Sequence, residues 1–154
     1  MLFRSAGAAV SVESDSVTAS KGRLRAIDVD MGAFPDLFPI VAVLMSVADG
    51  KSRLHGAPHL KLKETDRIQS TVAMLRAIGA EAEATADGCI IHGRETLSGG
   101  TVDHGGDHRI MMSAAVASLV CDGPVAMADT DCHRVSYPRF IDDMAALGIK
   151  VGFR

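Results

Sequence analysis

The segment Met74-Leu75-Arg76-Ala77-Ile78-Gly79-Ala80 has the pattern of a helix end, because a glycine closes a run of helix-forming residues. The same pattern occurs twice more, in Leu2-Phe3-Arg4-Ser5-Ala6-Gly7-Ala8 and in Met144-Ala145-Ala146-Leu147-Gly148-Ile149. The closing glycines Gly7, Gly79 and Gly148 therefore recur at intervals of 72 and 69 residues. Recurrence at this spacing indicates a repeated structural unit, with each glycine in the left-handed position after its helix.

Two stretches between these helix ends predict helices without a polar face. One runs from Asp36 to Gly50 and the other from Asp107 to Gly123. Apolar residues occupy all sides of both helices: Leu37, Phe38, Ile40, Val41, Val43, Leu44 and Val47 in the first, and Ile110, Met111, Met112, Ala114, Ala115, Val116, Leu119 and Val120 in the second. A helix with no polar face is buried in a core, so we expect both helices to be central.

Each buried helix is followed by a short predicted strand, at residues 51–54 and 124–128, and then by a helix with one apolar stripe. The stripe consists of Ile68, Val72, Leu75 and Ile78 in one unit and of Phe140, Met144 and Leu147 in the other. Such helices lie partly on the surface. Strand pairs are predicted after the first two closing glycines: residues 9–12 with 17–19, and residues 81–85 with 89–92.

The complete unit reads βαβαββ. Residues 1–20 are predicted to be the tail of one unit, residues 21–98 a complete unit, and residues 99–154 a nearly complete unit that lacks its last strand. We therefore predict an α/β fold made of repeated βαβαββ units with buried helices. A natural domain rarely begins with the last turn of a helix, so we expect the chain to be an incomplete part of one domain in a longer protein.

Composition excludes several classes of protein. The chain has 154 residues, of which 47% are hydrophobic and 23% charged, as in ordinary globular domains. Its net charge of −3 provides no broad basic surface for nucleic acid or for an anionic membrane. The apolar runs at residues 37–47 and 110–120 are too short to span a bilayer. Three widely spaced cysteines favour neither disulfides nor zinc, so we expect a cytoplasmic protein.

Charged residues stand at the starts of both buried helices. Asp36 and Asp107 each follow turn residues, which is typical of helix capping. His108 and Arg109 come next in the second helix, although an arginine at a helix N-terminus opposes the helix dipole. Backbone N–H groups already attract anions at such an end. Two interpretations stay open for Arg109, namely an anion-binding site and a solvated surface arginine.

The densest charged cluster is Lys61-Leu62-Lys63-Glu64-Thr65-Asp66-Arg67. On a helix, Lys63, Glu64 and Arg67 would share one face, because residues three and four positions apart are neighbours. One interpretation is a solvated patch of ion pairs with no further role, which this spacing alone would explain. A functional site would use the same residues, with a lysine and an arginine for phosphate or carboxylate oxygens and a glutamate for proton transfer.

Other candidate sites are weaker. His104 and His108 with Asp103 and Asp107 resemble a metal cluster, but the two glycines at 105 and 106 interrupt the helix that such a site would need, so we expect no metal. Cys132 lies beside a histidine and is the one cysteine with a claim to reactivity.

Four motifs together resemble the EPSP synthase family. They are Pro35-Asp36-Leu37-Phe38-Pro39, Lys63-Glu64-Thr65-Asp66-Arg67, Asp107-His108-Arg109-Ile110-Met111 and Ser136-Tyr137-Pro138. The resemblance covers essentially the whole chain and corresponds to the C-terminal portion of the family. It implies an enolpyruvyl transferase-like inside-out α/β barrel domain built of βαβαββ units. It also implies that most of one domain is here and that the N-terminal domain is missing.

The resemblance further implies a reaction. The family joins phosphoenolpyruvate to the 5-hydroxyl of shikimate 3-phosphate and releases phosphate by addition and elimination, in the biosynthesis of chorismate and aromatic amino acids. It uses no metal and no organic cofactor. By matching motif, Asp36 would contact the shikimate hydroxyls and act as the base. Glu64 would deliver a proton to the methylene carbon of phosphoenolpyruvate, supported by His108.

Substrate contacts follow from the same resemblance. Lys63 would hold the region of the 5-hydroxyl, and Arg67 and Arg109 would grip the carboxylate and phosphate of phosphoenolpyruvate. His59 stands where many members have a substrate-binding asparagine. Val135 stands where some members carry a lysine that binds phosphoenolpyruvate.

Two alternatives remain open. Transfer of enolpyruvyl to a UDP-amino sugar shares the architecture, but it predicts a Pro-Thr-Asp type of motif where residues 35–39 stand. A non-catalytic, stand-alone binding module is the other alternative. The missing domain would supply the remaining catalytic groups, so we expect the fragment to be inactive alone.

Overall fold

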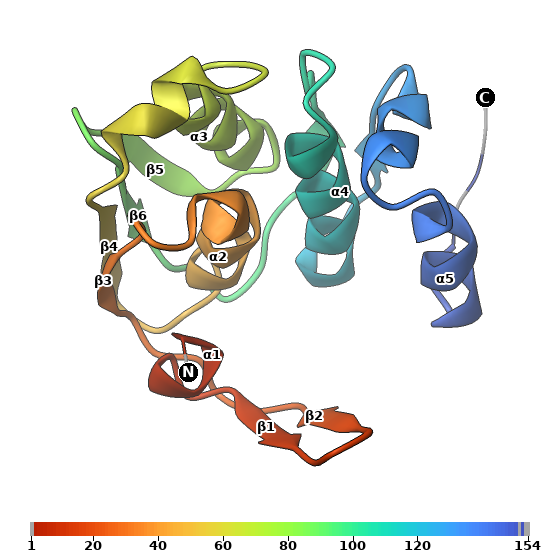
Figure 1. Ribbon diagram of the computed structural model, residues 1–154, viewed down its shortest axis with the longest axis horizontal. Helices are drawn as coiled ribbons and strands as arrows, with labels where there is room; N and C mark the ends of the chain where they lie inside the picture. Colours follow the sequence, from red (N-terminus) through yellow and green to blue (C-terminus); the bar gives the residue numbers. More distant parts are fainter. Residues whose placement is uncertain (1, 151, 153–154) are drawn as a thin grey trace.

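The computed structural model describes residues 2–150 and residue 152, and its elements follow the predicted repeat (Figure 1). The helices are α1 (Leu2–Ser5), α2 (Phe38–Met45), α3 (Arg67–Ala77), α4 (His108–Ala117) and α5 (Phe140–Ala146). The strands are β1 (Ala9–Val12), β2 (Val17–Ser20), β3 (Asp28–Asp30), β4 (Lys51–His55), β5 (Glu81–Ala84), β6 (Cys89–His92), β7 (Gly100–Thr101) and β8 (Val125–Ala126). Four short 3-10 helices complete the description: η1 (Pro35–Leu37), η2 (Pro58–Leu62), η3 (Ser118–Val120) and η4 (Thr130–Val135).

The three closing glycines adopt nearly the same backbone conformation. The φ angles of Gly7, Gly79 and Gly148 are +88°, +90° and +90°. A residue with a Cβ atom is strained at such φ angles, whereas glycine is not. The prediction that a left-handed glycine ends each of these helices is therefore confirmed.

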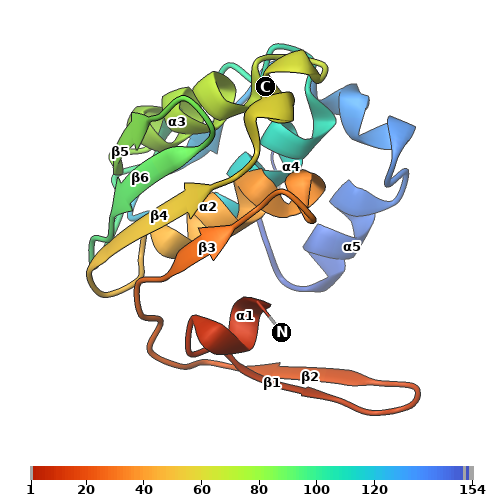
Figure 2. The same cartoon turned by 60° about the vertical axis from the view of Figure 1, so that its left-hand side comes forward.

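The central sheet has the strand order β3-β4-β6-β5, and the chain runs from β3 to β6 in the order βαβαββ (Figure 2). Strand β3 pairs parallel with β4, while β6 pairs antiparallel with both β4 and β5. Burial alternates along β4, where Ser52 and Leu54 face the core. This alternation is expected of a sheet with one covered face.

Helices α2, α3 and α4 pack against one another, and the sheet lies against α2 and α3 on one side (Figure 1). In α2 all residues except Ile40 and Leu44 are buried. Ile68, Val72 and Leu75 of α3, and Ile78 at its C-cap, are at most 2% exposed. These residues form one continuous apolar core, so the first buried helix and its striped neighbour are confirmed. The second predicted buried helix, α4, is buried on one side only, with Met112, Ala115 and Val116 partly accessible.

The prediction of burial is wrong for two apolar residues. Leu119 and Leu147 are both exposed. The α-helix α4 ends at Ala117 and continues as η3, whose tighter turn changes the direction in which Leu119 points. Helix α5 ends at Ala146, so Leu147 lies beyond its last turn while Phe140 and Met144 pack against Met111.

The two ends of the chain lie outside the main sheet. Strands β1 and β2 form the predicted hairpin, which extends away from the body beside α1 and is largely exposed (Figures 1 and 2). After Gly148, residues 149, 150 and 152 belong to no strand, and positions 151, 153 and 154 lie outside the described residues. Across the part that the structure describes, no helix combines the length and apolar character needed to cross a membrane.

Candidate functional site

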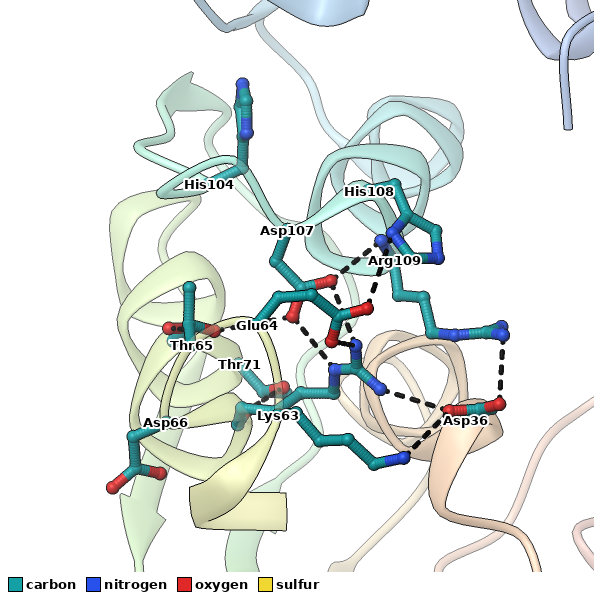
Figure 3. A network of polar contacts seen from close by, with 12 residues as sticks. Asp36, Lys63, Glu64, Thr65, Asp66, Thr71, His104, Asp107, His108 and Arg109 are labelled. Carbon is teal, nitrogen blue, oxygen red and sulfur yellow. Dashed lines mark hydrogen bonds and ion pairs between the residues drawn. The ribbon is translucent and has the colours of Figure 1, made fainter. Parts of the chain in front are cut away.

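Three segments that are far apart in the sequence meet at the starts of the core helices (Figure 3). They are η1 before α2, the segment before α3, and the first turn of α4. Each segment contributes charged side chains to one network of hydrogen bonds and ion pairs. Its members are Asp36, Lys63, Glu64, Arg67, Asp107, His108 and Arg109.

Arg67 is the centre of this network. It is the first residue of α3, and its side chain is only 1% exposed. Its Nε donates to Asp107 Oδ2 at 2.9 Å, and its Nη1 donates to Asp36 Oδ1 at 3.1 Å. Its Nη2 donates to Glu64 and also to Asp107 Oδ1 at 3.3 Å. A buried guanidinium needs such partners, because an unpaired buried charge is strongly destabilising.

Asp107 accepts hydrogen bonds from Arg67 through both of its carboxylate oxygens and is itself fully buried. It is the N-cap of α4, where its Oδ1 accepts from the Arg109 N–H at 2.9 Å. Burial raises the pKa of Asp107, but its hydrogen bonds and charge interaction with Arg67, and the N–H groups of Arg109 and Ile110, lower it further than burial raises it. Capping is therefore confirmed for Asp107. Its second role, holding Arg67, was missed because the two residues lie 40 positions apart.

Asp36 does not cap a helix, so the capping interpretation is wrong for this residue. It lies in the middle of η1, and neither η1 nor α2 has a side-chain cap. Its side chain is 48% exposed and accepts from Arg109 Nη2 at 2.9 Å, in addition to its bond from Arg67. Lys63 Nζ lies 3.8 Å from the same carboxylate. Three cations thus surround one accessible carboxylate.

Lys63 and Glu64 do not lie on a helix, so the prediction of a shared helical face with Arg67 is wrong. Asp66 caps α3 by accepting from the Gln69 N–H at 3.2 Å, which makes Arg67 the first helical residue. The backbone of Lys63 is extended. Glu64 nevertheless reaches Arg67, because the chain bends at the cap and returns the glutamate side chain over the start of α3.

Glu64 also faces His108. Its Oε1 lies 3.7 Å from His108 Nδ1, while its other oxygen is bound by Arg67. The Glu64 side chain is 45% exposed, whereas His108 is buried. A carboxyl group held between an arginine and a histidine, and open on one side, can exchange a proton with a bound molecule.

Two basic side chains of the network are accessible to a ligand. Lys63 and Arg109 are 35% and 30% exposed, and both lie at the Asp36 carboxylate. Arg67 sits beneath them with all of its nitrogens engaged by carboxylates. An arriving carboxylate or phosphate would therefore meet Lys63 and Arg109 first, as the forked donors of arginine suit both anions.

Two positions singled out from the sequence lie apart from the network. His59 is exposed on η2, and within the described residues no hydrogen bond or ion pair joins it to the cluster. Val135 is exposed at the end of η4. Val135 was not itself a predicted site residue, so the structure brings together all seven predicted site residues except His59.

The structure does not support the other two candidate sites, the reactive cysteine and the metal cluster. Burial, together with the negative charges of Asp129, Asp107 and Asp131, raises the pKa of Cys132, so the reactivity proposed for this thiol is not supported. Burial raises the pKa of Cys89 to about 12. Within the described part of the chain, no group of three or more His, Cys, Asp or Glu residues could hold a metal ion.

Similarity to known proteins agrees with this geometry. A family model described as EPSP synthase (3-phosphoshikimate 1-carboxyvinyltransferase) matches residues 1–144. The chain is 52% identical to a 3-phosphoshikimate 1-carboxyvinyltransferase of Methanocorpusculum labreanum, over 92% of this chain and 34% of that protein. A protein of the same name from Bacillus cytotoxicus is 42% identical, over 85% of this chain and 32% of the relative.

Solved structures show the same likeness. An EPSP synthase from Acinetobacter baumannii superposes with a TM-score of 0.88 at 28% identity, covering 96% of this chain and 38% of that one. The enolpyruvyl transferase NikO from Streptomyces tendae shares the fold, with a TM-score of 0.77 at 21% identity over 97% of this chain and 34% of that one. The predicted α/β fold is thereby confirmed, and the chain spans about a third of the length of the curated relatives it matches. By these matches, the chain belongs to the EPSP synthase family.

Proposed function

We propose that the chain is the C-terminal part of an enzyme that transfers the enolpyruvyl group of phosphoenolpyruvate to the 5-hydroxyl of shikimate 3-phosphate. The observation that carries this proposal is the network around Arg67, where two accessible carboxylates and two accessible cations meet at one place. Family membership supports the choice of substrates, since the relatives are named 3-phosphoshikimate 1-carboxyvinyltransferases.

Asp36 is the proposed base of the addition step. It accepts the proton of the 5-hydroxyl, whose oxygen then forms a bond to the second carbon of phosphoenolpyruvate. Lys63, 3.8 Å from this carboxylate, holds the same hydroxyl region. Arg109 donates to Asp36 at 2.9 Å, and its partly exposed side chain can turn toward the phosphate or carboxylate of phosphoenolpyruvate when this substrate binds.

Glu64 is the proposed acid. In its protonated form it delivers a proton to the methylene carbon, which becomes a methyl group in the tetrahedral intermediate. In the elimination, the Glu64 carboxylate takes a proton back from that methyl group while the carbon–oxygen bond to the phosphate breaks. The double bond forms again, and inorganic phosphate leaves with the proton that Asp36 had accepted. His108, 3.7 Å away, supports Glu64 through these exchanges, and Arg67 fixes the other carboxylate oxygen. The family resemblance assigns Arg67 a contact with phosphoenolpyruvate as well, which would require Glu64 or Asp36 to release one of its nitrogens.

The remaining groups would come from the part of the enzyme that this chain does not span. We therefore propose an N-terminal domain of the same enzyme as the partner, and no activity for the chain alone. The proposed compartment is the cytoplasm, consistent with three free cysteines. Transfer to a UDP-amino sugar and ligand binding without turnover are the competing functions that the experiment must distinguish.

The test is a chimera in which this chain replaces the corresponding third of the Methanocorpusculum labreanum relative. We expect it to release phosphate from phosphoenolpyruvate only when shikimate 3-phosphate is present. Glu64→Gln should lower kcat by about 10²–10⁴-fold, because it removes general acid catalysis, and should change substrate affinity far less. Steady-state kinetics and calorimetric titration measure the two effects.

Glu81→Gln is the matched control. Glu81 is similarly exposed and pairs with Arg94 at 3.4 Å, but on the sheet and away from the network. Its kcat should stay within about twofold of the parent chimera. A correctly folded chimera that binds both substrates without releasing phosphate would favour the binding module. Turnover with a UDP-amino sugar in place of shikimate 3-phosphate would overturn the proposed substrate.

A further inference from the structure

His104 lies next to the site without taking part in its network. Its side chain is 5% exposed, and its ring points away from the carboxylates around Arg67 (Figure 3). Both ring nitrogens nevertheless have polar neighbours. Nε2 lies 2.7 Å from the carbonyl oxygen of Ala128, and Nδ1 accepts from the Gly106 N–H at 3.1 Å.

These neighbours determine the protonation of the ring. A carbonyl oxygen can only accept a hydrogen bond, so Nε2 carries the proton and donates to Ala128. Nδ1 then presents its lone pair, which is what the Gly106 N–H requires. One neutral tautomer therefore satisfies the contacts to both Ala128 and Gly106. The Sγ atom of Cys132 lies 3.8 Å from the same Nδ1 and is only a neighbour, because the single lone pair of Nδ1 is used by Gly106.

The backbone held by this ring is a turn with little stiffness of its own. The carbonyl of His104 accepts from the Asp107 N–H at 2.9 Å, and the two residues between them, Gly105 and Gly106, have φ angles of +57° and +78°. Two consecutive positive φ values are typical of a type I′ turn. Glycine has the largest conformational freedom to lose, so such a turn depends on external bonds for one fixed shape.

The turn leads directly into the site. Asp107 follows it, caps α4 and binds Arg67, and the next two residues are His108 and Arg109. A Cβ atom on Gly105 would lie 3.1 Å from Thr65 Cγ2, so the turn packs closely against the segment that carries Glu64. A shift of the turn would therefore change the distances between Glu64, His108 and Arg109.

We propose that His104 is a positioning residue for the transfer reaction. Its ring fastens the two-glycine turn to the Ala128 carbonyl, beyond β8, and thereby fixes the direction in which α4 presents Asp107, His108 and Arg109. The inference rests on the proposed function for its effect on catalysis. The bond to Gly106, by contrast, can be measured whether or not the protein is an enzyme.

The experiment uses the same chimera with His104→Ala and His104→Asn. Alanine removes both contacts, whereas the asparagine carbonyl oxygen occupies nearly the position of Nδ1 and can accept from Gly106. We expect alanine to lower kcat/KM for phosphoenolpyruvate about tenfold, because small displacements of reacting groups are costly. Asparagine should recover part of that loss, because it keeps the bond to Gly106 but not the one to Ala128. Hydrogen–deuterium exchange of the peptide that contains Gly106 and Asp107 should accelerate in the alanine variant and return toward the parent rate with asparagine.

His133→Ala is the matched control. His133 is equally buried, and its Nδ1 lies 3.0 Å from the Tyr137 carbonyl oxygen, outside the network. This variant should lower the melting temperature as His104→Ala does but leave kcat/KM of the folded enzyme unchanged. Equal kinetic losses in the two alanine variants, or an asparagine variant as slow as the alanine one, would overturn the positioning role. If the parent chimera is inactive, the proposed function fails, and unchanged exchange in His104→Ala would separately overturn the bond to the turn.

Discussion

Asp36 and Asp107 stand just before α2 and at the N-cap of α4, respectively, yet their surroundings differ. Asp107 is fully buried, caps α4 and binds Arg67 through both oxygens. Asp36 is about half exposed, caps no helix and faces Lys63 and Arg109 as well as Arg67. The carboxylate before α4 is thus structural, whereas the carboxylate before α2 is accessible.

The turn before each helix accounts for this difference. Pro35 starts a 3-10 turn that places Asp36 in its middle, where the side chain points outward. Gly105 and Gly106 instead form a turn that leaves Asp107 extended at the N-cap, so its carboxylate folds back over the first N–H groups of α4. The comparison shows that the turn before each helix determines which groups its carboxylate contacts: other side chains for Asp36, and the N–H groups of α4 together with Arg67 for Asp107.

The largest effect should come from neutralising the buried aspartate. Asp107→Asn leaves the Arg67 guanidinium without its bidentate carboxylate, and breaking a buried pair from one side costs roughly 3–5 kcal/mol of unfolding free energy. Asp36→Asn should cost about 1 kcal/mol or less, since its carboxylate is accessible to water. Urea unfolding followed by circular dichroism measures both, and equal losses would remove the distinction between the two aspartates.

Activity should reverse the order of the two variants. In the chimera, Asp36→Asn removes the proposed base and should lower kcat about 10²-fold. Asp107→Asn should lower kcat less than about tenfold once the rate is corrected for the folded fraction. Asp49→Asn is a suitable control, because Asp49 forms an exposed pair with Arg23 away from the site and should leave kcat unchanged. A larger kinetic loss in Asp107→Asn than in Asp36→Asn would contradict the assignment of roles.

A smaller effect is expected on the pH dependence of stability. The pKa of Asp107 is lowered in the folded chain from its ordinary value of 3.8, with burial opposing and Arg67 causing the change. The unfolded chain therefore binds the proton first, so the contribution of Asp107 to stability is complete above its ordinary pKa and is lost as pH falls through the lowered value. Urea midpoints of the parent and Asp107→Asn should converge in part between about pH 5 and about pH 2. A constant difference across that range would show that the charge of Asp107 contributes nothing.

Much of the fold follows from local sequence patterns. The left-handed conformations of Gly7, Gly79 and Gly148 follow from the recurring helix ends, and the strands at residues 51–55 and 81–84 differ from the predictions by one residue. The errors at Leu119 and Leu147 occur where a helix changes type or stops, which a periodic pattern does not register.

The site was predictable in its members and less so in its arrangement. Lys63, Glu64 and Arg67 were expected on one helical face, which does not form because Asp66 caps α3 and leaves Lys63 and Glu64 before the helix. The grouping of these residues with His108 and Arg109 was implied by the family resemblance. From the sequence, His104 was considered only as a possible metal ligand. Its actual partners are the backbone carbonyl of Ala128 and the backbone N–H of Gly106, and residue types do not reveal backbone partners.

The sequence by itself determined the glycine-closed helix ends, the buried helix α2 and the charged residues before α2 and α4, because helix periodicity and glycine conformation are local properties. Only the tertiary structure decided that Arg67 is buried between Asp107 and Asp36, which lie 40 and 31 positions away. Burial and charge pairing depend on neighbours in space, and packing α2, α3 and α4 together brings those neighbours to one site.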